Sequence, residues 1–158
     1  LAEQAQLPPS LSALDILNYK CHSTNLPHSA AKQALDEFNL PVQAHLKPTR
    51  NYSKGMRQRT SLALTLCNKP QLILLDEPMS GLDALGRAET LAILKQRKAD
   101  GATILMSSHI VSDMVQLCDE ILLMAHGEIC ERVEIRDHAL HEVEMLEAKL
   151  KHWTRSSQ

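Results

Sequence analysis

Two adjacent carboxylates follow a short apolar run, and this position indicates phosphoryl-transfer chemistry. Residues 72–75 precede Asp76 and Glu77, and because both faces of the run are apolar they predict a buried parallel strand. Carboxylates at the carboxyl end of such a strand lie where open α/β sheets bind ligands. One carboxylate can hold Mg²⁺ through water, and the other can orient or deprotonate an attacking water.

The elements that would position these carboxylates alternate strand and helix beyond Pro70, a pattern that implies parallel strand pairing. Asp83 is the expected N-cap of the helix that follows the carboxylates. Strands are predicted at 72–75, 102–106, 120–124 and 128–132, helices at 84–98, 111–118 and 136–153, and a tight turn at His126-Gly127.

The first part of the chain predicts helices instead. Residues 11–17 and 30–38 carry apolar side chains at helical spacing, and each run begins near a serine that could cap it. A loop is expected at 48–52, and Ser53 then stands at the N-cap of a further helix. The chain therefore predicts an α/β fold with a small all-helical subdomain, divided into segments 1–52, 53–132 and 133–158.

Composition excludes several classes of function. The chain has 158 residues, a net charge of −2 and 3% aromatic residues, so it lacks the basic stripe or stacking platform of a nucleic-acid surface. Its four cysteines form no CxxC pair and predict reduced, mostly buried thiols in a cytosolic protein. No apolar stretch approaches the roughly 18–20 residues that span a bilayer, so any membrane role must come through a partner.

The segment 52–59 reads Tyr-Ser-Lys-Gly-Met-Arg-Gln-Arg and resembles the signature sequence of ATP-binding-cassette (ABC) ATPases, in the SKGM form familiar from exporters. LILLDEP, SGLD and SSH follow at the expected intervals, so the resemblance covers nearly the whole chain. It implies a partial P-loop NTPase core with a parallel sheet, a helical subdomain that carries the signature, and ATP and Mg²⁺ as cofactors.

The resemblance also implies a role for each acidic and imidazole side chain. Asp76 matches the Walker B aspartate that binds Mg²⁺ through water, and Glu77 matches the base that positions the hydrolytic water. Asp83 ends the D-loop, residues 80–83, which in this family crosses the dimer interface. His109 matches the switch histidine that contacts the γ-phosphate; taken alone, it is a polar residue ending a strand.

The signature turn, Ser53–Met56, matches residues that reach the γ-phosphate of an ATP held by the opposite subunit. A helix N-terminus offers unpaired N–H groups and a partial positive charge to an anion, and Gly55 allows close backbone approach. Lys54 stands where the common motif has Gly and Met56 where it often has Gln. Lys54 could attract phosphate or simply be a solvated surface lysine.

At the start of the chain, Glu3 aligns with the Q-loop glutamine, which in the family senses Mg²⁺ and the membrane partner. Gln4 or Gln6 could fill that position instead, and an ordinary polar start to a loop is a further alternative.

The phosphate-cradling Walker A loop, GxxxxGK[ST], is absent from the sequence. The only glycine pair at that spacing is Gly81 and Gly86, which is followed by Arg87 and Ala88 and lies after the acidic strand. The chain also opens on Leu1 without a signal segment. We therefore expect an ABC ATPase domain cut just before its Q-loop, with unpaired strand edges, poor ATP binding and negligible hydrolysis on its own.

The resemblance implies the ATP-hydrolysing subunit of an ABC transporter, at the cytoplasmic face of a membrane. Its implied partners are a transmembrane permease subunit and a second ATPase subunit, with no nucleic acid. Two alternatives stay open: an ABC ATPase of DNA repair or translation, and an inactive interaction module that offers its signature helix to an intact partner.

Overall fold

The computed structural model describes residues 1–2 and 6–155 and divides into two compact units, Leu1–Ser107 and Ser108–Gln158. Each unit combines helices with a two-stranded sheet, and the first of these sheets is parallel. The α/β fold class with a parallel sheet is thus confirmed. Within the described ranges, no helix has both the length and the hydrophobicity needed to cross a membrane.

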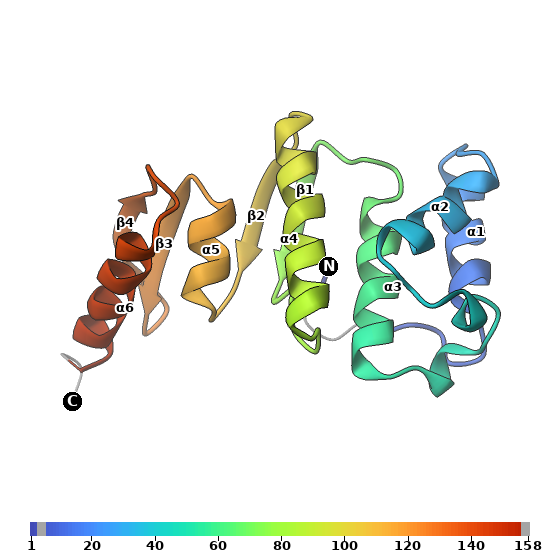
Figure 1. Cartoon of the computed structure of the whole chain (residues 1–158), viewed down its shortest axis with the longest axis horizontal. Helices are drawn as coiled ribbons and strands as arrows, with labels where there is room; N and C mark the ends of the chain where they lie inside the picture. Colours follow the sequence, from blue (N-terminus) through green and yellow to red (C-terminus); the bar gives the residue numbers. More distant parts are fainter. Residues whose placement is uncertain (3–5, 156–158) are drawn as a thin grey trace. The chain divides into compact units, whose positions relative to one another are not determined.

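Three helices open the first unit and pack against one another (Figure 1). They are α1 (Ala13–Ser23), α2 (Ser29–Glu37) and α3 (Lys54–Leu66), with the 3₁₀ turns η1 (Val42–Ala44) and η2 (Thr49–Asn51) before α3. Ser12 caps α1 through a capping box with Asp15, as expected for this helix. The serine cap predicted for the second helix is wrong, because Ser29 lies inside α2 and His28 precedes it without a capping bond.

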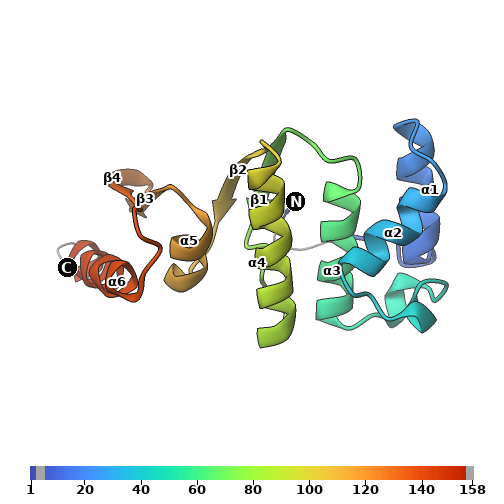
Figure 2. The same cartoon turned by 45° about the horizontal axis from the view of Figure 1, so that its top comes forward.

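The predicted strand–helix–strand unit follows. It consists of β1 (Leu72–Asp76), α4 (Ala84–Ala99) and β2 (Thr103–Ser107). The two strands are parallel and α4 lies alongside β1 in both views (Figures 1 and 2). Asp83 caps α4 by accepting the Gly86 N–H at 2.8 Å, which confirms the predicted cap.

One face of β1 is exposed, so the prediction of a strand buried on both faces is wrong for this chain. Ile73 and Leu75 are buried, whereas Leu72 and Leu74 are 60% and 53% exposed. Leu105 of β2, the register partner of Leu74, is 62% exposed on the same face. A parallel strand is buried on both faces only when layers cover both, and here α4 covers one face.

The second unit consists of α5 (Val111–Leu117), β3 (Glu120–Ala125), β4 (Glu128–Glu134) and α6 (Leu140–Arg155). The strands form an antiparallel hairpin, so parallel pairing inferred for 120–124 is wrong. Its turn is the predicted His126-Gly127, with φ values of 53° and 82° that suit a two-residue hairpin turn. An apolar core formed by α5, both strands and Leu146 of α6 holds the unit together.

The boundaries of these units differ from those of the three predicted segments. Residue 52 falls inside the first unit because α3 packs against both α1 and α2. Residue 132 falls within β4. The described strands form two separate sheets, β1-β2 and β3-β4, in which β2 and β3 are not paired.

Candidate nucleotide site

Asp76 and Glu77 lie at the carboxyl end of β1, and Ser107 at the end of β2 links them. Asp76 and Ser107 are partners in the parallel register. The Ser107 hydroxyl donates to Asp76 Oδ1 at 2.6 Å and accepts the Glu77 N–H at 3.1 Å. A single side chain therefore orients the predicted metal-binding carboxylate and fixes the backbone of the predicted base.

The chain turns sharply at Glu77. Its φ of 45° lies in the left-handed region, which costs a non-glycine residue on the order of 1–3 kcal/mol. The Glu77 carbonyl accepts the Ser80 N–H at 3.0 Å and closes the turn. β1 thus ends at Asp76, and Glu77 lies half-buried in the turn directly after it.

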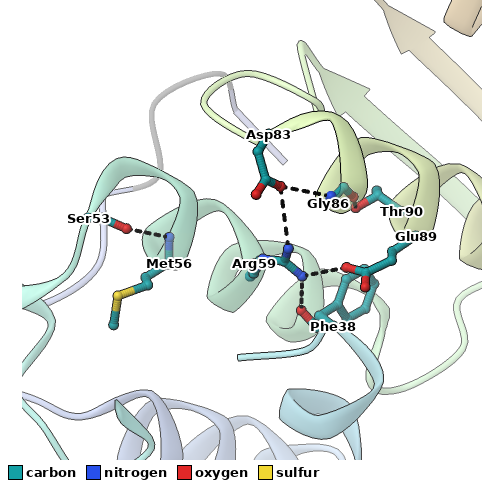
Figure 3. A network of polar contacts seen from close by, with 8 residues as sticks. All are labelled: Phe38, Ser53, Met56, Arg59, Asp83, Gly86, Glu89 and Thr90. Carbon is teal, nitrogen blue, oxygen red and sulfur yellow. Dashed lines mark hydrogen bonds and ion pairs between the residues drawn. The ribbon is translucent and has the colours of Figure 1, made fainter. Parts of the chain in front are cut away.

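The signature turn begins α3 as predicted. Ser53 is the N-cap, and its hydroxyl accepts the Met56 N–H at 3.2 Å (Figure 3). Because the first amides of a helix have no intrahelical acceptor, those of Lys54 and Gly55 can face an anion. Within this chain the backbone at Gly55 also lies close to Gly81, since a Cβ added to Gly55 would lie 3.0 Å from the Gly81 carbonyl oxygen.

Buried contacts anchor the signature turn from both sides. On the upstream side, the Tyr52 hydroxyl donates to the Ala44 carbonyl at 2.6 Å and accepts the Ala13 N–H at 3.3 Å. Burial raises the pKa of Tyr52 above its usual value, so the hydroxyl keeps its proton. On the downstream side, the buried Gln58 amide donates from Nε2 to the Pro78 carbonyl at 2.8 Å. The turn is therefore held against both α1 and the segment after the carboxylates.

Arg59 joins the signature helix to the end of the D-loop (Figure 3). Its Nη1 donates to the Phe38 carbonyl at 2.8 Å and to Glu89 Oε2 at 2.9 Å, while Nη2 lies 3.8 Å from Asp83 Oδ1. A Cβ on Gly86 would lie 2.6 Å from Arg59 Nη2 and 2.8 Å from Asp83 Oδ1. Gly86 therefore leaves room for the guanidinium, where it lies in this structure, beside the start of α4.

Two predicted residues remain, Glu3 and His109. Glu3 falls outside the described residues, as does Gln4, while Gln6 is exposed. His109 belongs to the second unit, where it is exposed and lies two residues beyond the end of β2.

Sequence reasoning missed the roles of Ser107, Gln58 and Arg59. Ser107 had a usable signal, because it ends the strand next to the acidic one and parallel strands place their carboxyl ends together. Gln58 had a weaker signal, a polar side chain four residues before the buried Leu62 on one helix face. For Arg59 the decisive partner is the main-chain carbonyl of Phe38, which no side-chain pattern reveals.

The family model described as ABC transporter matches residues 1–80. The chain belongs to this family. An uncharacterized ABC transporter ATP-binding protein of Nostoc sp. is 40% identical over 134 residues, which cover 82% of this chain and 40% of that protein. The lantibiotic transport ATP-binding protein SrtF of Streptococcus pyogenes is 34% identical over 129 residues, covering 82% of this chain and 56% of that protein. The chain thus spans about half the length of these ABC relatives.

Solved structures give the same fold. The dimeric post-hydrolysis state of the ATP-binding cassette MJ0796, bound to ADP and Pi, matches with a TM-score of 0.77 at 22% identity, covering 85% of this chain and 61% of that one. An ATP-binding subunit of an ABC transporter matches with a TM-score of 0.76 at 25% identity, covering 91% and 65%. The chain therefore has the fold of part of an ABC ATPase.

Proposed function

We propose that this chain supplies the acidic and signature parts of an ATP-hydrolysing site in an ABC transporter ATPase. The observation that supports this most directly is the Asp76–Ser107–Glu77 arrangement at the carboxyl ends of two parallel strands. Its donor set suits Mg²⁺, since this ion prefers hard oxygen ligands and needs only one or two carboxylates. In the site, Mg²⁺ would neutralise charge on the phosphates of ATP.

The residues of this chain divide the work of in-line attack by water. Asp76 would hold Mg²⁺ through water, because its carboxylate has further acceptor positions besides the one that accepts the Ser107 hydroxyl. Glu77, in the turn directly after β1, orients and deprotonates the attacking water. His109 contacts the γ-phosphate, and Glu3 belongs to the loop that senses Mg²⁺ and the membrane partner.

The signature turn acts on a second nucleotide. The Lys54 and Gly55 amides at the start of α3 and the Ser53 hydroxyl face the γ-phosphate of an ATP held by another ATPase subunit, while the Met56 N–H donates to the Ser53 hydroxyl and orients it. Asp83 and the rest of the D-loop couple the two sites across that subunit interface. A permease subunit provides the path across the membrane, and the ATPase is peripheral on the cytoplasmic face. Relatives named for lantibiotic and bacitracin transport support a transporter role, and the net charge of −2 does not favour nucleic acid.

The phosphate-binding loop must come from other polypeptide, because none of the 158 residues forms one. The test compares this chain alone with a completed protein, in which the phosphate-binding half of the Nostoc relative precedes Leu1 in one polypeptide. Equilibrium titration with ATP is expected to give micromolar affinity for the completed protein and no saturable binding for the chain alone. Micromolar binding by the chain alone, or none by a folded completed protein, would overturn the proposal.

A second candidate is an inactive module that offers its signature turn to the ATP of an intact subunit, and the Ser53-capped start of α3 is the feature that supports it. This candidate predicts that the unmodified chain stimulates ATP turnover by the full-length Nostoc relative, and that Ser53→Ala weakens the stimulation. Unchanged turnover with a stoichiometric excess of the chain would eliminate it.

A further inference from the structure

We propose that Lys54 is a positioning residue whose side chain holds the D-loop against the signature turn. The inference rests on the proposed function, because it assigns Lys54 a role in the same site. The two polar groups of Lys54 then have different roles. Its backbone amide can face phosphate, while its ammonium group bonds to another residue of the same chain.

The ammonium contact joins residues 26 positions apart. Lys54 Nζ donates to Ser80 Oγ at 2.9 Å, on the exposed side of the first unit. Both residues belong to segments that the family uses at the subunit interface, the signature turn and the D-loop. The hydrogen bond therefore connects the group that contacts one nucleotide to the loop that couples the two sites.

The aliphatic part of Lys54 covers Gly81. A Cβ built on Gly81 would lie 2.6 Å from Lys54 Cγ and 2.7 Å from Cδ, so no larger residue fits beneath the lysine as it stands. Gly81 also has a φ of 80°, which favours glycine for a separate reason. The D-loop backbone and the lysine stem thus pack directly on one another, and the common family motif, with Gly at position 54, has no side chain to make this contact.

Two further contacts join the start of α3 to residues 78–81, below the contact that Lys54 makes at the surface. The Gly81 carbonyl oxygen lies 3.0 Å from the position of a Cβ on Gly55, so the two backbones approach closely. Deeper in the unit, Gln58 donates to the Pro78 carbonyl. Gln58 holds the buried side of this interface and Lys54 holds its solvent side, where opening would otherwise begin.

The first experiment uses the 158-residue chain and needs no nucleotide. Amide hydrogen exchange is measured at Ser80 and Leu82, whose N–H groups bond to the Glu77 and Met79 carbonyls. Lys54→Met keeps an aliphatic stem without the ammonium, and exchange is expected to accelerate about threefold to tenfold, since such a hydrogen bond contributes ~0.5–1.5 kcal/mol. Lys47→Met, at another exposed lysine, is the matched control and is expected to change nothing. Equal exchange in Lys54→Met and the unsubstituted chain would overturn the proposal.

The second experiment separates positioning from phosphate binding in the completed protein. Lys54→Met is expected to lower kcat for ATP about threefold to tenfold with little change in KM, and Ser80→Ala is expected to do the same without adding to it. A raised KM with unchanged kcat would instead show that the ammonium binds phosphate, and additive effects would show that the two side chains act separately. If the proposed function itself is wrong, the completed protein hydrolyses no ATP with either Lys or Met at position 54. The hydrogen-exchange comparison of the 158-residue chain still tests the positioning role in that case.

Discussion

Removing the hydroxyl of Tyr52 tests whether the signature turn is anchored as the structure shows. In Tyr52→Phe the ring stays buried, but the Ala13 N–H loses its partner, while the Ala44 carbonyl keeps the hydrogen bond from the Lys47 N–H at 2.9 Å. A buried backbone group left without a partner costs about 1–3 kcal/mol. Because one N–H is left without a partner and its bond is long at 3.3 Å, we expect the substitution to lower the free energy of unfolding by about 1–2 kcal/mol.

Urea denaturation followed by far-UV circular dichroism measures this change. With an m-value of ~2 kcal/mol/M, the midpoint is expected to fall by about 0.5–1 M urea. Tyr19→Phe is the matched control, because Tyr19 is 78% exposed on α1 and its hydroxyl loss is expected to stay within about 0.5 kcal/mol. A Tyr52→Phe midpoint no lower than that of Tyr19→Phe would refute the anchoring role.

The same pair of variants makes a pH-dependent prediction. Burial raises the folded-state pKa of Tyr52 above its usual value of 10.0. The stabilisation by the neutral hydroxyl is therefore complete below pH 10.0 and is lost as pH rises through the folded-state pKa. The stability difference between Tyr52→Phe and the unsubstituted chain should shrink above pH 10.0; a difference that stays constant would contradict this.

Three other predictions concern single contacts. Ser107→Ala in the completed protein should raise the Mg²⁺ concentration for half-maximal ATPase activity about tenfold, because Asp76 loses the hydroxyl that orients it. Ser23→Ala is the control, and an unchanged Mg²⁺ concentration in Ser107→Ala would exclude Ser107 from orienting Asp76. Gly86→Ala should destabilise the chain by ~1–3 kcal/mol in urea denaturation, and by less when Arg59 is also replaced by Met. If Gly86→Ala alone stabilises the chain, the Arg59 guanidinium can move away from the added methyl group at no cost. Hydrogen bonds from the Arg136 and Ala139 amides lower the pKa of Glu142 below its usual 4.5, so its stabilisation is complete above pH 4.5 and lost below it. Acid unfolding of Glu142→Gln should therefore show a weaker pH dependence below 4.5 than that of the exposed-site control Glu144→Gln.

Features controlled by neighbouring residues were predictable from the sequence. Ser53 and Asp83 cap α3 and α4 because a short polar side chain before a helical run accepts an amide two or three residues later. His126-Gly127 forms the hairpin turn because both residues tolerate a positive φ. The free cysteines were expected as well, although Cys21 is the only one of the four that is buried.

Features controlled by distant residues were not predictable in the same way. The apolar run at 72–75 has the composition of a strand covered on both faces, but composition cannot show how many layers are present. Lys54 is exposed, as the surface-lysine alternative expects, but its ammonium also bonds to Ser80, a partner that depends on how the D-loop folds back. The roles of Ser107 and Arg59 likewise follow from strand register and from a main-chain carbonyl.

The most direct test of the central claim, that Asp76 and Glu77 act on a nucleotide gripped by other polypeptide, is the Glu77→Gln variant of the completed protein. ATP affinity and single-turnover hydrolysis are measured together, with Glu128→Gln, an exposed strand residue, as the matched control. Glu77→Gln should bind ATP as tightly as the unsubstituted protein and hydrolyse it about 10²–10⁴-fold more slowly, as expected when a general base is removed. Hydrolysis at the control rate with intact ATP binding would contradict the account.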